Sequence, residues 1–81
     1  MIRKLNGQAI AFYPAKTKEN TLIFEIGDVV KAFPVLNDSG YCFRLSDGCI
    51  YADGGINELI EYLESAGENS LKRITALLLA S

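Results

Sequence analysis

The sequence contains no histidine and no tryptophan, and it has only two cysteines and two prolines in 81 residues. Without histidine the protein lacks the usual general base near neutral pH, the partner of serine or cysteine in nucleophilic catalysis, and the commonest transition-metal ligand. Two cysteines separated by six residues, with no second pair, do not make a zinc site. We therefore expect no catalytic residue and no metal site.

Nucleotide and calcium motifs are missing as well. The sequence has neither the G-x-x-x-x-G-K-[ST] loop nor the G-x-G-x-x-G turn that bind nucleotide phosphates. The segments around Asp38 and Asp53 do not extend into the spaced acidic ligands of a calcium loop. Gly54-Gly55 could cradle an anion at the start of a helix, but the carboxylate of Asp53 would repel it. We expect no cofactor.

No long apolar run is present. No uninterrupted hydrophobic run is longer than the five residues of Ala76–Ala80, far short of the roughly 20 residues that span a bilayer. Arg3 and Lys4 are followed by polar residues 6–8, which interrupt the apolar stretch that a signal peptide requires. We expect a cytoplasmic protein that makes no membrane contact.

The clearest structural signal lies in residues 41–63. Asp47-Gly48 between two apolar runs predicts a tight hairpin turn, with Leu45 opposite Ile50 and Ser46 opposite Cys49. The same register gives one apolar strand face: Tyr41, Phe43, Leu45, Ile50 and Ala52. A helix is expected next, capped by Asp53, with its apolar residues at helical spacing and its end at Gly67. Those apolar residues are Ile56, Leu59, Ile60 and Leu63.

The remaining elements are predicted from shorter patterns. Residues 1–7 form a basic lead-in, and residues 8–13 and 21–26 alternate as strands do. Residues 29–36 are either a strand, which would pair with 41–46 and place Leu36 opposite Tyr41, or one helical turn that stops before Pro34. A second helix is expected to be capped by Asn69 or Ser70, with the apolar stripe Leu71, Ile74 and Leu78.

These elements predict an α+β domain over residues 1–81: a small antiparallel β-sheet of four or five strands, in a meander or hairpins, followed by two C-terminal α-helices packing on one face. A chain of 81 residues, of which 49% are hydrophobic, has room for one core.

Charge is distributed unevenly, although the net charge is only −2. Residues 45–71 contain no lysine or arginine, but they contain Asp47, Asp53, Glu58, Glu61, Glu64 and Glu68. The glutamates recur at helical spacing. They are either a solvated outer face or a docking edge for a partner with a basic surface.

Two further surfaces are open to interpretation. The mixed sheet face, with Phe33, Arg44 and Tyr51 beside Val35 and Cys42, is either covered by another element or exposed as an interface. The leucines at the end of the last helix, Leu77, Leu78 and Leu79, are either core residues or a contact for a homodimer.

We interpret the chain as a non-enzymatic interaction domain, a small regulator or inhibitor that docks on a larger protein through the acidic helix. Small regulators of phages or mobile elements share this profile, by analogy alone. The alternative is a nucleic-acid-binding accessory protein that uses Arg3, Lys4, Lys16, Lys18 and Arg44 together with the aromatic sheet face. Overall acidity and the absence of a contiguous basic stretch count against that alternative.

Overall fold

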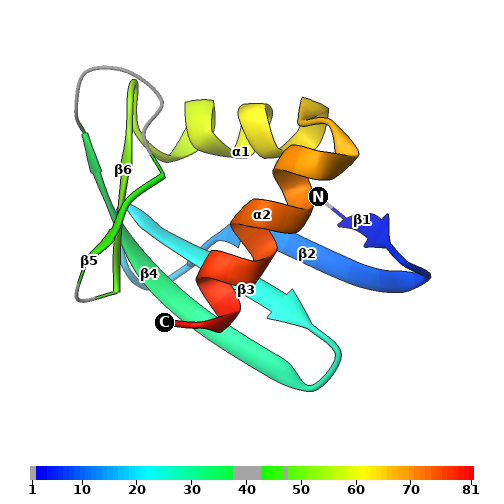
Figure 1. The fold of residues 1–81 in the computed structure, drawn as a ribbon. Helices are drawn as coiled ribbons and strands as arrows, with labels where there is room; N and C mark the ends of the chain where they lie inside the picture. Colours follow the sequence, from blue (N-terminus) through cyan, green and yellow to red (C-terminus); the bar gives the residue numbers. More distant parts are fainter. Residues whose placement is uncertain (1, 38–42, 47) are drawn as a thin grey trace.

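The computed structural model describes residues 2–37, 43–46 and 48–81 as six β-strands followed by two α-helices (Figure 1). The strands are β1 (Ile2–Leu5), β2 (Gln8–Pro14), β3 (Thr21–Ile26), β4 (Val29–Asn37), β5 (Leu45–Ser46) and β6 (Cys49–Ala52); the helices are α1 (Ile56–Ser65) and α2 (Glu68–Leu79). The strands form one sheet in the order β1-β2-β3-β4-β6-β5. All neighbours are antiparallel except β4 and β6, which are parallel. The predicted α+β class is confirmed.

Residues 2–5 form a strand, whereas the sequence predicted only a short basic segment before the first strand. Strand β1 pairs antiparallel with β2, with Leu5 opposite Gln8. Asn6 and Gly7 make the two-residue connection, and both have positive φ, 53° and 80°. Asn-Gly is a strong signal for this kind of hairpin turn, because both central positions require positive φ. The prediction for this segment was wrong because it overlooked that signal.

Residues 29–37 form a strand, which decides between the two predicted alternatives. Pro34 is tolerated because of its place in the ladder. The amide of Val35 donates to the carbonyl oxygen of Asn20 at 2.6 Å, and hydrogen-bonded and non-hydrogen-bonded pairs alternate in an antiparallel ladder. Pro34 and Thr21 are therefore a non-hydrogen-bonded pair, so the missing N–H of the proline breaks no bond to β3.

The strand beside the second half of β4 is β6, and not residues 41–46 as predicted. Val35 lies opposite Ile50, and Leu36 lies opposite Tyr51 where the prediction placed Tyr41. This arrangement puts β6, whose residues Ile50 and Ala52 are buried, inside the sheet. The two-residue β5 is left at the edge.

The register of the β5–β6 hairpin is confirmed. Leu45 lies opposite Ile50 and Ser46 lies opposite Cys49, and Gly48 has the positive φ, 78°, that the turn requires. The predicted hairpin residues Tyr41, Cys42 and Asp47 lie outside the described residues.

Helix α1 begins at a different cap from the one predicted. Its N-cap is Gly55, without any side-chain cap hydrogen bond, so the prediction that Asp53 caps this helix was wrong. Gly55 has a φ of 90°, and an added Cβ would lie 2.9 Å from Oδ1 of Asn37. Both the backbone conformation and the close approach of Asn37 therefore require glycine at this position.

Helix α2 follows α1 after two residues. Ala66 leaves α1 in an extended conformation, and Gly67 is the N-cap of α2 with a φ of −64°. Helix α1 therefore ends directly before Gly67, as predicted, whereas the prediction that Asn69 or Ser70 caps α2 was wrong. The predicted stripe of α2 is confirmed, since Leu71, Ile74 and Leu78 are buried.

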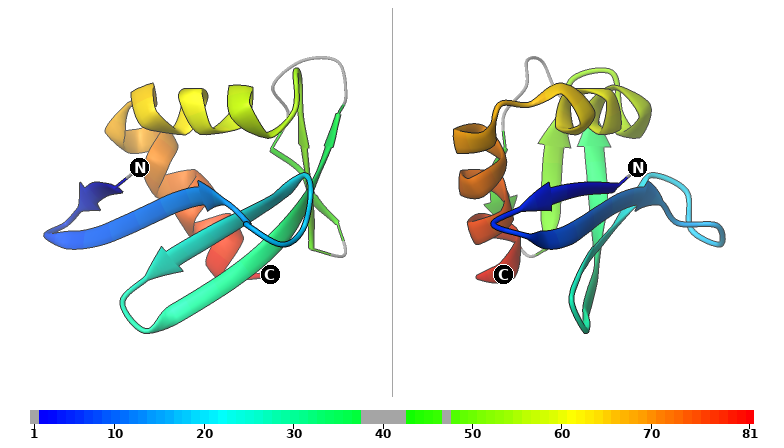
Figure 2. Two further views of the ribbon diagram at one scale, coloured as in Figure 1. Left: turned by 180° about the vertical axis from the view of Figure 1, so that it is seen from behind. Right: turned by 90° about the vertical axis from the view of Figure 1, so that its right-hand side faces the viewer.

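Both helices pack on one face of the sheet, and their apolar stripes join the inward side chains of the strands in one core (Figures 1 and 2). The largest fully buried side chains are Phe12, Phe24, Ile10, Leu22, Leu59, Leu63, Leu71 and Leu78. In the part of the chain that the structure describes, neither helix has the length and apolarity needed to cross a membrane.

Candidate protein-interaction surfaces

The acidic residues predicted as a docking edge lie on α1 and at its two ends. We call Asp53, Glu58, Glu61, Glu64 and Glu68 the acidic surface. All are exposed to solvent except Glu58, which is half-buried. Leu59 and Leu63 of the same helix are buried against the sheet. The helix is thus held by its apolar stripe, which leaves its carboxylates free to meet a partner.

No ion pair neutralises the acidic surface: its carboxylates have no cationic partner among the residues that the structure describes. Neither helix has a basic residue in its last turn. Glu64 lies in the last turn of α1, where the partial negative charge of the helix terminus adds to the repulsion. A cationic partner would relieve this repulsion.

One cation, Arg3, binds the main chain at the end of α1. Arg3 projects from the helix-covered face of β1, opposite Ile10. Its Nη1 donates to the carbonyl oxygens of Leu63 at 3.0 Å and Ala66 at 2.5 Å. Arg3 therefore satisfies the terminal carbonyls of α1 and is not free to bind nucleic acid, which weakens the alternative function. Lys4, Lys16 and Lys18 remain exposed.

Lys31 binds the main-chain oxygens at the end of α2, as Arg3 does at the end of α1. It projects from β4 opposite Phe24, on the helix-covered face. Its Nζ donates to the main-chain oxygens of Leu79 at 3.0 Å and Ser81 at 2.6 Å. Each helix therefore receives from the sheet the C-terminal cation that its own last turn lacks.

The structure does not bring the predicted mixed sheet face together. Phe33 is only 3% exposed and lies in the core with Val35. Tyr51 is half-buried and points to the opposite face, since its neighbour Ile50 is the residue that pairs with Val35. Arg44 is exposed, but it precedes β5 and does not belong to a strand. The prediction of this face was wrong because it assumed that β4 pairs with residues 41–46.

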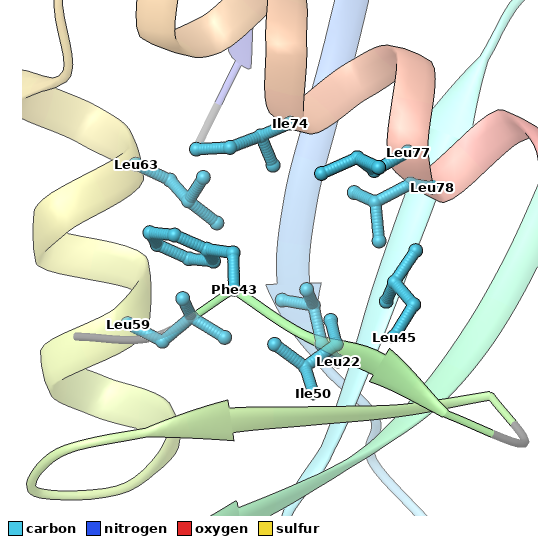
Figure 3. Close-up of a pocket in the computed structure, with 9 residues that line it drawn as sticks. All are labelled: Leu22, Phe43, Leu45, Ile50, Leu59, Leu63, Ile74, Leu77 and Leu78. Carbon is cyan, nitrogen blue, oxygen red and sulfur yellow. The ribbon is translucent and has the colours of Figure 1, made fainter. Parts of the chain in front are cut away.

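The three C-terminal leucines divide between core and surface. Leu78 is buried, which removes it as a dimer contact, whereas Leu77 and Leu79 are 40% and 42% exposed. Leu77 also lines a small pocket between the two helices and the β5–β6 hairpin (Figure 3). The nine lining residues are all apolar: Leu22, Phe43, Leu45, Ile50, Leu59, Leu63, Ile74, Leu77 and Leu78.

This apolar pocket offers little space and no polar chemistry. Figure 3 shows its side chains pointing toward one another from both helices and the hairpin. Its cavity volume of about 10 Å³ is close to the minimum that holds one water molecule. Such a lining supports hydrophobic packing alone. Within the described ranges, no group of three or more aspartate, glutamate or cysteine side chains is arranged to hold a metal ion.

One surface was not predicted from the sequence, which is the sheet face opposite the helices. We call its apolar strand residues Ile2, Ala11, Ile23, Val30, Ala32 and Leu36 the open face. Seen from behind, β2, β3 and β4 pass in front of α2 (Figure 2, left). Ile2 and Val30 are 73% and 62% exposed. The signal in the sequence was the nearly continuous apolar run of β4, a pattern typical of strands that are covered on both faces.

Comparison with known proteins does not identify a relative. No protein-family model matches the sequence, no curated protein matches it, and no solved structure matches the fold. The function is therefore inferred from the surfaces described above.

Proposed function

We propose that the protein is a non-enzymatic protein–protein interaction domain, a small cytoplasmic regulator or inhibitor. It docks on the basic surface of a larger protein, such as one that binds nucleic acid, and its acidic surface makes the contact. The observation that supports this function is the set of carboxylates on and beside α1 that, in the described part of the chain, has no cationic partner.

The physical argument rests on position and charge. Glu61 and Glu64 are exposed on a helix whose other side is fixed in the core by Leu59 and Leu63. Residues three apart on a helix are neighbours, with about 5–6 Å between their Cβ atoms. A partner with a row of lysines or arginines would be attracted over long range and would bind faster at low salt than at high salt.

The test compares two double variants of equal charge. Glu61→Gln with Glu64→Gln removes two charges from the acidic surface. Glu19→Gln with Asp28→Asn removes two charges from exposed loop and turn positions. The wild-type protein is used to capture a partner from the native host, and the affinity of the purified partner is then measured for all three proteins at low and high salt.

We expect the acidic-surface variant to lose about 2- to 30-fold in affinity, since each exposed ion pair contributes roughly 0.2–1 kcal/mol. The control variant should bind like the wild type. Equal binding by both variants, or binding that does not respond to salt, would exclude the acidic surface as the docking site.

A further inference from the structure

The open face combines exposed apolar side chains with a hollow beside Ile2. Ile2, Ala11, Glu25 and Val30 form one row across β1, β2, β3 and β4, because each lies opposite the next in the register. The large side chains at the ends of the row are exposed, and the small side chain of Ala11 lies between them. A hollow of about 310 Å³ opens over Ala11, bordered by Ile2 and Glu25.

Two strand residues of this face are charged at neutral pH, and their charges are opposite. Lys4 of β1 is exposed beside Ala9, one row away from Glu25 of β3. The two side chains make no ion pair with each other among the described residues. Each therefore has capacity to bind a group of opposite charge on another molecule.

Glu25 is held in a defined position. The hydroxyl of Tyr13 donates to its Oε1, which leaves the other carboxylate oxygen able to accept from an ammonium group. The carboxylate raises the pKa of the Tyr13 phenol, so the phenol stays protonated and continues to donate. The acceptor is thus oriented before a partner arrives.

We propose that the open face binds a second copy of this chain in a two-fold symmetric dimer, in which Lys4 of each copy pairs with Glu25 of the other. In an isologous interface the same patch meets itself, so a patch that carries one positive and one negative group is self-complementary. The dimer also covers the exposed side chains of Ile2 and Val30, which removes an apolar patch from water.

Charge distinguishes this occupant from the partner of the acidic surface. Lys4 and Glu25 cancel, so the open face has no net charge with which to select a basic protein. A second copy of the chain carries the same Lys4 and Glu25, so it supplies the complementary charge for each of them. The two binding surfaces are separate, because the acidic surface lies on and beside α1 and the open face lies on the side of the sheet that the helices do not cover.

The test exchanges the two charges. Sedimentation equilibrium is measured for the wild type, for Lys4→Glu and for Glu25→Lys, and then for an equimolar mixture of the two variants. We expect the wild type to dimerise and each variant alone to dimerise at least about tenfold more weakly, because both ion pairs become repulsive at once. The mixture should recover a heterodimer, because the two substituted side chains attract each other across it and so do the unchanged Lys4 and Glu25.

Two controls make the outcome decisive. Lys72→Glu changes the same charge on the exposed side of α2 and should leave dimerisation unchanged, and circular dichroism confirms that each variant is folded. A monomeric wild type overturns the proposal. So does a dimer that tolerates both single variants, which would point to another contact such as Leu77 and Leu79. Variants that weaken the dimer but do not associate with each other also overturn it.

Discussion

Arg3 in the first strand donates a hydrogen bond of 3.0 Å from Nη1 to the carbonyl oxygen of Leu63, 60 residues further along the chain. The same nitrogen donates to Ala66. The contact ties the first strand of the sheet to the end of α1, which carries the acidic surface. This guanidinium group therefore acts together with the buried Leu59 and Leu63 to fix the position of that surface relative to the sheet.

Replacing Arg3 with methionine should destabilise the fold while keeping most of the apolar stem. Hydrogen bonds from a charged donor contribute about 1.5–3 kcal/mol, so we expect the free energy of unfolding in urea to fall by that amount. Lys16→Met, in an exposed loop, is the matched control and should change it by less than about 0.5 kcal/mol. If the two variants were equally stable, the bonds to α1 would contribute nothing.

Gly55 and Gly67 are the N-caps of the two helices, but alanine should lower the stability of the protein only at Gly55. At Gly55 the φ of 90° and the nearby Oδ1 of Asn37 both oppose a Cβ, so Gly55→Ala should cost about 1–3 kcal/mol. At Gly67 the φ is −64° and no atom lies within 4 Å of an added Cβ, so Gly67→Ala should stay within about 0.5 kcal/mol of the wild type. Thermal unfolding measures both. A loss at Gly67 as large as the one at Gly55 would contradict this expectation.

The features predicted correctly are those that local patterns determine. The hairpin register follows from alternation over a few residues around Asp47-Gly48, and the buried stripe Leu71, Ile74 and Leu78 follows from helical spacing. The exposure of Glu61 and Glu64 was likewise predictable, because they lie on α1 away from its apolar stripe.

The features predicted wrongly depend on contacts distant in sequence. Adjacent segments favour antiparallel pairing, so nothing local indicated that Val35 would pair with Ile50 in parallel and carry Phe33 into the core. The cap of α1 at Gly55 reflects the approach of Asn37 from β4. The apolar run of β4 indicated that its second face is also apolar, but the residues that share the open face follow only once the register of four strands is known.

Tyr13 should titrate later than an ordinary tyrosine. Its pKa is raised because its hydroxyl donates to the carboxylate of Glu25, with desolvation and the negative charge of Glu25 acting in the same direction. A group with a raised folded pKa contributes stability below its unfolded pKa, about 10 for tyrosine. That contribution is lost as the pH rises through the folded pKa.

The measurement is a pH titration of phenolate absorbance, with Tyr13→Phe subtracted from the wild type to isolate this group. The difference curve should have its midpoint above pH 10, and Glu25→Gln should return the midpoint toward the ordinary value because the negative charge is gone. A wild-type midpoint at or below that of the other tyrosines would show that the bond to Glu25 does not persist in solution.

Thr75 and Thr21 provide opposite predictions for one chemical change. Thr75 in α2 is 4% exposed, and its Oγ1 has no hydrogen-bond partner among the described residues. The Oγ1 of buried Thr21 donates to the carbonyl oxygen of Glu19 at 3.2 Å. Thr75→Val should therefore leave the protein as stable as the wild type or up to about 1 kcal/mol more stable, because it removes a buried hydroxyl group that makes no hydrogen bond.

Thr21→Val, which loses a hydrogen bond, should cost about 1 kcal/mol. Both variants replace a hydroxyl with a methyl group at a buried position, so the difference between their unfolding free energies isolates the hydrogen bond. If Thr75→Val were as destabilising as Thr21→Val, the Thr75 hydroxyl would have to be hydrogen-bonded in solution, which would identify a buried water or an alternative rotamer beneath α2.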